Sequence, residues 1–272
     1  MKTGLIVSLT DAPEEAFARL TALGIHTCQL NCWRQAYFTP AVAAAVKAVA
    51  AARGVEITAV WCGWEGPAEW NFLQGPLTLG IVPAQYRAQR LEMLLRGAEF
   101  TAWLGVRDMV THAGFIPEDP NQAQYQEVIA ALRRLAGRCH ELGLRFLFET
   151  GQETPVTILR AIEDIGLDNV GVNLDPANLI LYGKANPVDA LDVIGPYVWG
   201  VHAKDGLYPT TGRALGREVP LGEGKVNIQR LVARLKELGY TGALTIEREI
   251  EGEEQIRDIL RAKSLLDQLI AA

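Results

Sequence analysis

The chain has 272 residues, of which 49% are hydrophobic, 21% charged and 7% aromatic, a composition typical of soluble globular proteins and not of disordered, collagen-like or coiled-coil chains. It contains 26 Lys and Arg against 32 Asp and Glu, so its formal net charge of -6 gives no overall attraction to nucleic-acid backbones. No apolar run approaches the roughly 20 residues that a membrane-spanning helix needs. We therefore expect neither nucleic acid nor a membrane as a partner.

The cysteines and the N-terminus indicate a reduced, cytoplasmic protein. Cys28, Cys32, Cys62 and Cys139 form no CxxC pair, and the chain turns acidic before any hydrophobic stretch of signal-peptide length. The sequence also lacks a Gly-rich P-loop, a GxSxG elbow and a GxGxxG fingerprint. We therefore expect no nucleotide cofactor.

Short apolar runs rich in β-branched residues alternate with longer segments of helical period along the whole chain. Eight predicted strands cover residues 4–9, 26–32, 55–61, 106–112, 144–149, 169–175, 197–204 and 242–249. Each is followed by a predicted helix, over residues 13–23, 40–53, 83–104, 121–142, 155–165, 187–194, 227–238 and 253–270. Several helices have Pro near the first turn and Gly just past the end, as helix boundaries prefer.

This alternation predicts a single (β/α)8 TIM-barrel domain over residues 1–272. Eight units in 272 residues leave about 34 residues for each unit, close to what such a barrel requires. A doubly wound sheet would have fewer strands and usually a glycine-rich first turn, which GLIVSLTDAPEE lacks. The longest stretches without a predicted element, 62–82 and 206–226, both follow strands on the face where barrels place active sites, so we expect them to wall the pocket.

Four ionisable residues fall at or near the C-terminal ends of consecutive predicted strands, where barrel side chains converge. Glu149 ends LRFLFE, Asp175 ends NVGVNLD, His202 lies late in YVWGVHAK, and Glu247 lies late in GALTIERE. Any one carboxylate alone could simply cap the next helix or pair with a nearby Lys or Arg. Three in one cavity repel each other unless a cation lies among them. Carboxylates with one imidazole suit Mn, with Mg or Co as alternatives, better than a closed structural zinc site.

The motifs ETGQE, NLDPAN, HAKD, PLGEG and TIERE resemble the xylose-isomerase-like sugar phosphate isomerase/epimerase superfamily, which contains ketose 3-epimerases, inosose dehydratases and, more distantly, apurinic endonucleases. The resemblance covers essentially the whole predicted barrel and implies Glu149, Asp175, His202 and Glu247 as metal ligands. It also implies that Glu149 and Glu247 remove and return a proton on opposite faces of a sugar, through an enediolate stabilised by the metal. Which of the two glutamates removes the proton stays open.

Two positions depart from the ketose 3-epimerase pattern. Asn178 stands where those enzymes typically have a His, and Lys204, Asp205 and Gly206 stand where they have an Arg, with Arg213 only further on. HAKD resembles instead the form found in inosose-dehydratase-like members. A metal-dependent dehydratase or lyase acting on a keto sugar, keto-glycoside or keto-inositol is therefore the alternative to an isomerase or epimerase acting on a ketose.

Further substrate contacts are expected around the predicted pocket. His112 ends its strand in THAGF, where it would bind the sugar or orient Glu149. Aromatic residues cluster in and after the strand 55–61, and Trp61 and Trp64 are expected to stack on a sugar ring, although core packing or an oligomer contact suits each equally well. The other residues in or after this strand that could stack are Trp70 and Phe72, and the other expected polar contacts are Glu153, Asn178, Lys204 and Arg213.

Other classes are weaker candidates. Apurinic endonucleases assemble a larger, His-rich site, whereas only four His occur here, and His26 and His140 fall at structural or exposed positions. A non-catalytic sugar-binding barrel would not need an intact ligand set. No arginine cluster indicates a phosphate pocket, so we expect a non-phosphorylated small-molecule sugar substrate. Barrel enzymes that resemble this chain are commonly dimers or tetramers, and we expect a homo-oligomer.

Overall fold

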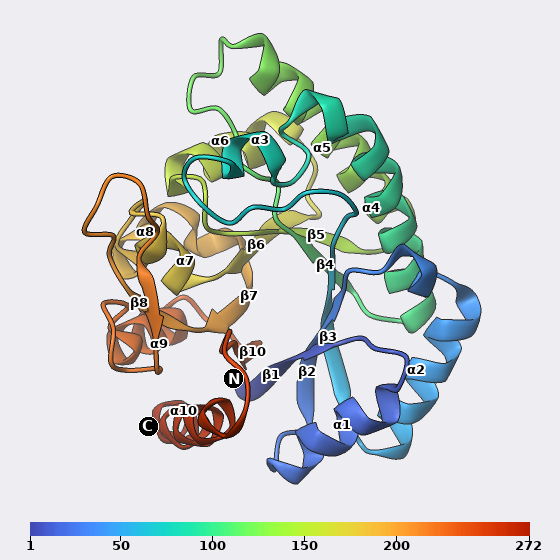
Figure 1. Cartoon of the computed structure of the whole chain (residues 1–272), viewed down its shortest axis with the longest axis vertical. Coiled ribbons are helices and arrows are strands. Elements are labelled where there is room, and N and C mark those ends of the chain that lie inside the picture. Colours follow the sequence, from blue (N-terminus) through green and yellow to red (C-terminus); the bar gives the residue numbers. More distant parts are fainter.

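Eight parallel strands close into a barrel in the computed structural model, which describes residues 1–272 (Figure 1). The strands are β1 (Lys2–Ser8), β2 (Thr27–Cys32), β3 (Glu56–Cys62), β4 (Asp108–Thr111), β5 (Arg145–Glu149), β6 (Val170–Leu174), β7 (Val198–Ala203) and β10 (Ala243–Ile246). They follow one another around the barrel in chain order, and β10 pairs with β1 from Lys2 opposite Ala243 to Leu5 opposite Ile246. The predicted (β/α)8 fold is confirmed.

Eight main helices surround the barrel (Figure 1). They are α1 (Pro13–Ala22), α2 (Pro40–Ala52), α4 (Ala84–Leu104), α5 (Ala123–Glu141), α6 (Pro155–Ile165), α8 (Pro187–Ile194), α9 (Ile228–Glu237) and α10 (Glu253–Ala271), all within two residues of the predicted bounds. The side chains of Thr39, Thr154 and Asn186 cap α2, α6 and α8 by accepting hydrogen bonds from backbone N–H groups of the first turn. Capping residues followed by proline are why the starts of these helices could be read from sequence.

Strand β10 is shorter than predicted. It ends at Ile246, so Glu247 lies just past the strand and not inside it. The next side chain, Arg248, pairs with Asp258 of α10 at 2.8 Å and with Glu218 at 2.9 Å. These two ion pairs draw the chain out of the sheet at this point.

The two stretches expected to be irregular are partly regular. Residues 62–82 contain the short helix α3 (Gly75–Thr78), and residues 206–226 run through a hairpin of β8 (Asp205–Leu207) and β9 (Arg217–Val219). Three more short elements are η1 (Gln35–Tyr37), α7 (Pro176–Leu181) and η2 (Gly195–Tyr197).

One buried carboxylate holds the root of this hairpin. Oδ1 of Asp205 accepts from the backbone N–H groups of Gly206 and Val226, and Oδ2 accepts from those of Gly222 and Gly224, at 2.8 to 3.0 Å. A Cβ on Gly224 would come within 2.1 Å of Asp205 Oδ1, so only glycine allows this close approach. The PLGEG motif thus supplies two of the four amides that surround this carboxylate.

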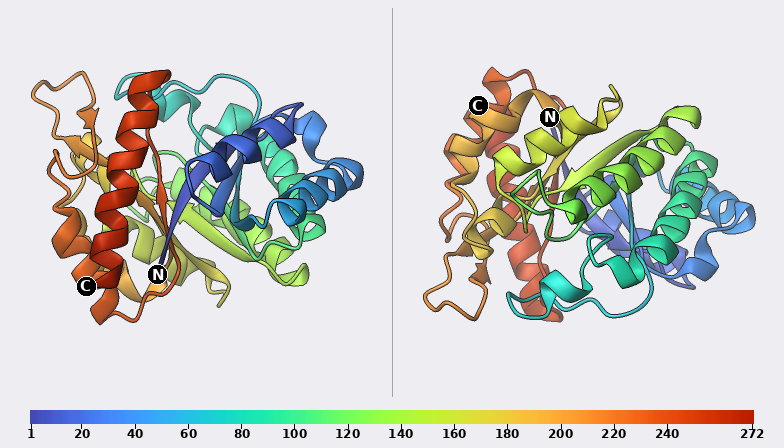
Figure 2. Two further views of the ribbon diagram at one scale, coloured as in Figure 1. Left: turned by 90° about the horizontal axis from the view of Figure 1, so that it is seen from below. Right: turned by 90° about the horizontal axis from the view of Figure 1, so that it is seen from above.

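The two ends of the chain lie on the same side of the molecule (Figure 2). Strand β1 at the N-terminus and helix α10 at the C-terminus are joined by a hydrogen bond from Thr3 Oγ1 to Asp267 Oδ1 of 2.7 Å. None of the helices has both the length and the apolar composition needed to cross a lipid bilayer.

Candidate active site

Four side chains meet at the C-terminal mouth of the barrel. Glu149 is the last residue of β5, Asp175 follows β6, His202 lies in β7, and Glu247 follows β10. One possible ligand atom of each lies within 4.8 Å of all the others. Nδ1 of His202 is 3.2 Å from Glu149 Oε1, 3.0 Å from Glu247 Oε2 and 3.6 Å from Asp175 Oδ2. The structure therefore brings together the four residues that the strand ends indicated.

The chemistry of this cluster fits a divalent cation. Asp175 Oδ2, His202 Nδ1 and Glu247 Oε2 are all buried, and none of them makes a hydrogen bond of suitable geometry. Buried polar atoms in folded proteins nearly always have a hydrogen-bond partner or a bound ion. Three such atoms that face one another without a hydrogen bond therefore indicate a site for one shared ion. Three carboxylate groups and one imidazole nitrogen form a donor set that Mn, Mg or Co accepts.

The electrostatics of the cluster also favour a positive charge at its centre. Burial alone would raise the pKa of Glu149, but His112 and His202 outweigh it and hold this pKa well below its usual range. Burial alone would likewise lower the pKa of His202, yet Glu149 and Glu247 raise it well above its usual value. The carboxylates thus stabilise a cation among them, a role that a bound metal ion fills as well as a proton does.

Neighbouring groups fix the orientation of two of the three acidic side chains. Oδ1 of Asp175 caps α7 by accepting from Asn178 N–H at 2.8 Å, which leaves Oδ2 free to face the cluster. The indole N–H of Trp61 donates to Glu149 Oε2, and His112 Nε2 lies 3.4 Å from Glu149 Oε1. Asp175 therefore does cap a helix, as carboxylates at strand ends often do, and it still presents one oxygen to the cluster.

Sequence reasoning missed Gln29, which supports His202 from β2. The amide of Gln29 lies 2.9 Å from His202 Nε2, and both side chains are completely buried. An amide donates or accepts according to its rotation, so it can satisfy Nε2 while Nδ1 faces the carboxylates. The two residues are 173 positions apart, and a lone Gln inside an apolar strand carries no local signal of this contact.

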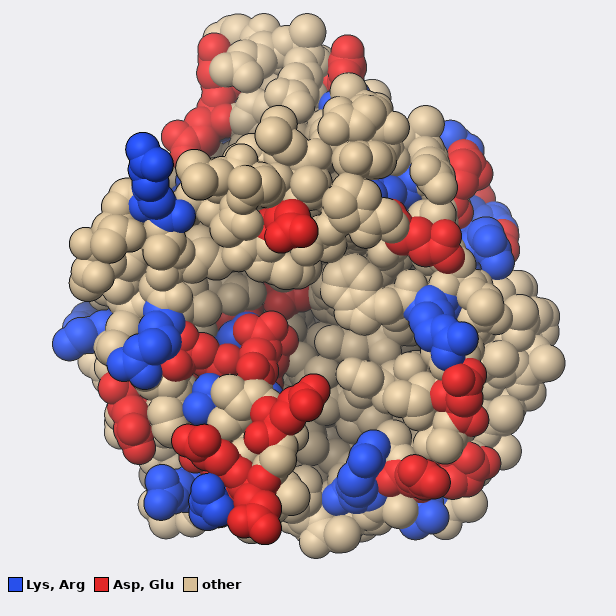
Figure 3. Space-filling view, viewed as in Figure 1, with Lys and Arg blue, Asp and Glu red and all other residues tan.

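A cavity opens from the cluster to solvent. It is lined by Asn31, Trp33, Trp61, Trp70, His112, Glu149, Asn178, Leu181, Tyr182, Lys204, Leu215, Glu247 and Glu249. Figure 3 shows the hollow at the centre of the face, with acidic side chains gathered to its left and uncharged atoms along its right side. The structure thus brings six of the predicted site residues, His112, Glu149, Asn178, Lys204, Glu247 and Trp61, to one cavity.

Three other predicted contacts do not line this cavity. Trp64 is 2% exposed because it packs beneath Trp33 and Trp61. Glu153 is buried, and no hydrogen-bond partner reaches either of its carboxylate oxygens. Arg213 is exposed in the loop between β8 and β9, which extends away from its root at Asp205.

Lys204 places a second positive charge beside the cluster. Its Nζ lies 2.8 Å from Glu249 Oε2, 3.4 Å from Glu247 Oε2 and 3.5 Å from both Asp175 Oδ2 and Asn178 Oδ1. Burial would lower the pKa of Lys204, but the surrounding carboxylates raise it well above its usual value. The ammonium group is therefore charged and within reach of a ligand in the cavity.

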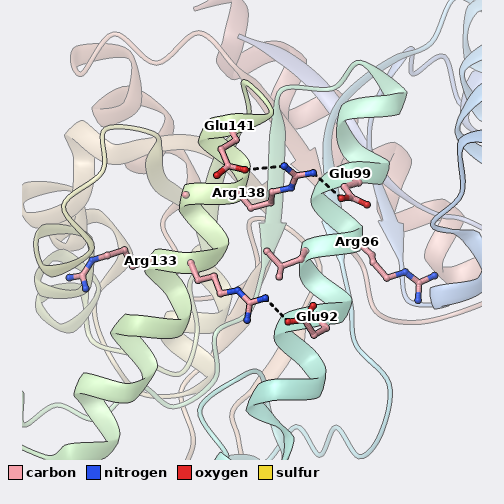
Figure 4. Close-up of a pocket in the computed structure, with 9 residues that line it drawn as sticks. Glu92, Arg96, Glu99, Arg133, Arg138 and Glu141 are labelled. Atoms are coloured by element: carbon pink, nitrogen blue, oxygen red, sulfur yellow. Dashed lines mark hydrogen bonds and ion pairs between the residues drawn. The ribbon is translucent and has the colours of Figure 1, made fainter.

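A wider groove of about 610 Å³ lies between α4 and α5, on the outside of the helix ring (Figure 4). Its charges pair with one another across the groove, Arg134 with Glu92 at 2.7 Å and Arg138 with Glu99 at 2.9 Å. No side chain lining it has a buried polar atom without a partner. Exposed, mutually paired charges of this kind offer little to a ligand, so the cavity at the mouth of the barrel is the candidate site.

Residues 17–267 match the family model of the xylose isomerase-like TIM barrel, and the chain belongs to this family. It is similar to a xylose isomerase domain protein from Planctomyces limnophilus, with 33% identity, coverage of 98% of this chain and 96% of that one, and a TM-score of 0.92. It shares the fold of the 3-keto-D-glucoside 4-epimerase YcjR from E. coli, with 17% identity, full coverage of both chains and a TM-score of 0.73.

Curated relatives match over a shorter stretch. The L-ribulose-5-phosphate 3-epimerase UlaE of Shigella sonnei is 28% identical over 202 residues, which cover 68% of this chain and 65% of that protein. An uncharacterized protein of Methanocaldococcus jannaschii, MJ1311, is 26% identical over 180 residues, which cover 60% of this chain and 56% of that protein. The matches thus span less than two thirds of the length of these relatives.

Proposed function

We propose that the protein is a divalent-metal-dependent isomerase or epimerase that acts on a ketose or a related small sugar. The observation that carries this proposal is the convergence of Glu149, Asp175, His202 and Glu247, whose ligand atoms all lie within 4.8 Å of one another. In the last three of these residues the buried atom that faces the cluster makes no hydrogen bond. Membership of the xylose isomerase-like family and the similarity to an epimerase support the same class of reaction.

The four side chains would hold Mn, with Mg or Co as alternatives, and the ion would act as a Lewis acid that makes the C–H next to a sugar carbonyl more acidic. Glu149 and Glu247 come from β5 and β10, which are separated by β6 and β7 around the barrel. A sugar lying between their carboxylates has one of them on each side. One carboxylate takes the proton and leaves its electron pair in an enediolate, and the other returns a proton to the opposite face of the same carbon.

Other side chains around the cavity prepare this transfer. Trp61 and His112 hold the Glu149 carboxylate in one orientation, which lowers the entropic cost of reaching the reacting carbon. Lys204 and Asn178 present donors towards the cavity and would bind oxygen atoms of the sugar. Asn178 and Lys204, the two residues that differ from the ketose 3-epimerase pattern, would thus both contact the sugar.

A second candidate is a metal-dependent dehydratase or lyase acting on a keto sugar, keto-glycoside or keto-inositol. The observation that favours it is Lys204, a buried ammonium 3.4 Å from Glu247 Oε2. After one glutamate has taken the proton, the electron pair would break the bond to the hydroxyl group on the carbon β to the carbonyl, and the protonated glutamate would pass its proton to that oxygen, which leaves as water. Lys204 is placed to donate a hydrogen bond to that departing oxygen.

The test is proton NMR of Mn-loaded protein in deuterated water with a panel of free ketoses and keto-inositols. We expect deuterium to enter next to the carbonyl together with a new epimer or isomer. A dehydrated product would establish the second candidate. Full exchange by rigorously metal-free protein would contradict the metal-dependent mechanism for both.

A further inference from the structure

Aromatic rings form a continuous arc along one side of the mouth. Trp33 follows β2, and its ring centroid lies 4.6 Å from that of Trp61 in β3. The rings of Trp61 and His112 are 6.1 Å apart, and His112 lies 5.0 Å from Trp70 in the segment between β3 and α4. All four rings line the cavity that also contains Glu149.

The members of this arc differ sharply in exposure. Trp61 and His112, the two rings next to Glu149, are 4% exposed. Trp33 and Trp70, at the two ends, are 38% and 40% exposed. Indole rings left in water at the entrance of a cavity gain free energy when an apolar surface covers them.

The structure around Trp33 holds its ring in place. A Cβ on Gly63 would come 2.4 Å from Cε3 of Trp33, so the indole lies directly on the backbone after β3. Trp64 packs edge-on against the same ring at 5.6 Å and is itself fixed by the guanidinium of Arg90 at 5.3 Å. A ring held on two sides is a rigid surface, and rigidity lowers the entropic cost of binding.

The opposite rim of the cavity is polar, and this selects the kind of ligand. Lys204, Glu249 and Asn178 line it, and the Glu249 side chain is 59% exposed beside the ammonium group of Lys204. A pyranose ring offers both surfaces at once, an apolar C–H face for an indole and a rim of hydroxyl groups for charged and amide partners. A purely apolar chain would leave the polar rim without partners.

A sugar placed between Glu149 and Glu247 would lie next to the inner rings, Trp61 and His112, which contact Glu149, whereas Trp33 and Trp70 lie at the two ends of the arc. We infer that Trp33 and Trp70 form an outer subsite for a second ring joined to the reacting sugar, and that the substrate class is a keto-glycoside. This inference rests on the proposed function, because the reacting ring is placed by the two glutamates.

Unreactive sugars test the subsite apart from the chemistry. Isothermal titration calorimetry of the Mn-loaded protein should show that the disaccharides cellobiose and maltose bind about tenfold more tightly than glucose. Trp33→Ala and Trp70→Ala should each weaken disaccharide binding by about three- to tenfold and leave glucose binding unchanged. Trp103→Ala is the matched control, because Trp103 is 41% exposed on α4 and does not line the cavity.

A second measurement needs no variant. N-bromosuccinimide oxidises exposed indoles, and mass spectrometry of the wild-type protein should show that a disaccharide protects Trp33 and Trp70 but not Trp103. Equal affinity for disaccharides and glucose, or no protection of either outer ring, would overturn the inference. So would protection that rises with protein concentration in the absence of sugar, because a second copy of the chain would then cover these rings.

The proposed function can fail separately from the subsite. If disaccharides bind through Trp33 and Trp70 but no keto sugar exchanges deuterium, the proposed reaction is refuted and the sugar-binding role of the two rings is confirmed. If free ketoses exchange deuterium and disaccharides do not bind, the reaction stands and the outer subsite is refuted.

Discussion

The two halves of the barrel mouth have the same architecture but offer different chemistry. The strands β5, β6, β7 and β10 deliver Glu149, Asp175, His202 and Glu247, whereas β2 and β3 deliver Trp33 and Trp61. Figure 3 shows acidic side chains on one side of the hollow and uncharged atoms on the other. In our proposal the charged half performs the reaction and the aromatic half selects the substrate.

The aromatic half also acts on the charged half. Rings next to a carboxylate exclude water and lower the local dielectric, which strengthens every charge interaction there. Trp61 joins the two halves directly, since its indole N–H donates to Glu149. We therefore expect some substitutions to change the function of one half alone and others to change both.

The largest effect is expected from the two carboxylates proposed to move the proton. Glu149→Gln and Glu247→Gln should each reduce deuterium exchange into the substrate by about 10²- to 10⁴-fold, because an amide cannot act as a base. Glu254→Gln, an exposed change in the first turn of α10, should leave exchange unchanged. Exchange near the wild-type rate in either cavity variant, with its fold intact by circular dichroism, would refute the role of that glutamate.

Glu153, buried near His112, should make stability depend on pH. Burial raises the pKa of Glu153 to about 7, although His112 acts in the opposite direction. Its ordinary value is 4.5, so as pH rises from about 4.5 to about 7 the unfolded chain loses this proton first and the free energy of unfolding decreases. Above pH 7 the full penalty of about 3 kcal/mol is present.

Urea unfolding at pH 5 and pH 8 measures this effect. Glu153→Gln has no charge to bury, so its stability advantage over the wild type should be small at pH 5 and close to the full penalty at pH 8. A variant less stable than the wild type at pH 8 would show that the Glu153 carboxylate is stabilised by a partner in the folded protein.

Gln29 should control metal affinity from behind His202. Gln29→Leu removes the partner of Nε2, and the affinity for Mn should fall by about 10- to 100-fold in isothermal titration calorimetry. The ¹⁵N shifts of His202 should also change, since Nε2 loses its hydrogen-bond partner. Gln268→Leu, on the exposed face of α10, is the control. Unchanged affinity and unchanged shifts would mean that Gln29 only fills space.

The smallest effect is expected in the aromatic half alone. Gly63→Ala places a methyl group against Trp33 and should cost about 1–3 kcal/mol, because the ring must shift from its packed position against Trp61 and Trp64. Disaccharide binding should weaken while Mn affinity stays constant. Gly137→Ala, in α5 with nothing near the added methyl group, should be neutral or stabilising. A loss of Mn affinity in the Gly63 variant would show that the halves are not separable.

Most of the barrel could be predicted from the sequence because each element carries local signals. Pro at the start of α6 and Gly166 at its end bound that helix at both sides, and its predicted and observed bounds coincide. The length of strand β10 was overestimated. Arg248 forms ion pairs with Asp258 and Glu218 outside the sheet, and these partners cannot be recognised from the sequence around Arg248. The β8–β9 hairpin was missed because the amides that Asp205 gathers are spread over about twenty residues.

The candidate site divides in the same way. Its four charged residues could be predicted because parallel strands in a closed barrel direct their C-terminal ends to one place, whatever their distance in sequence. Gln29 and Trp33 could not, because their importance lies in contacts made across the barrel mouth and not in any local pattern. Residues that are far apart in the sequence and meet only in the folded protein produce no periodic pattern in the sequence.

The carboxylate of Asp205 has a consequence for how this barrel can diversify. It binds the backbone at both ends of the segment from Gly206 to Val226. The loop of residues 209–215 lies between these ends, so its length can change without altering the contacts of Asp205. Lengthening such a loop costs little closure entropy. Leu215 lies in this loop and lines the cavity. Natural variation, or a loop graft by an engineer, can therefore reshape the entrance between these two anchors while the four charged residues below it keep their positions.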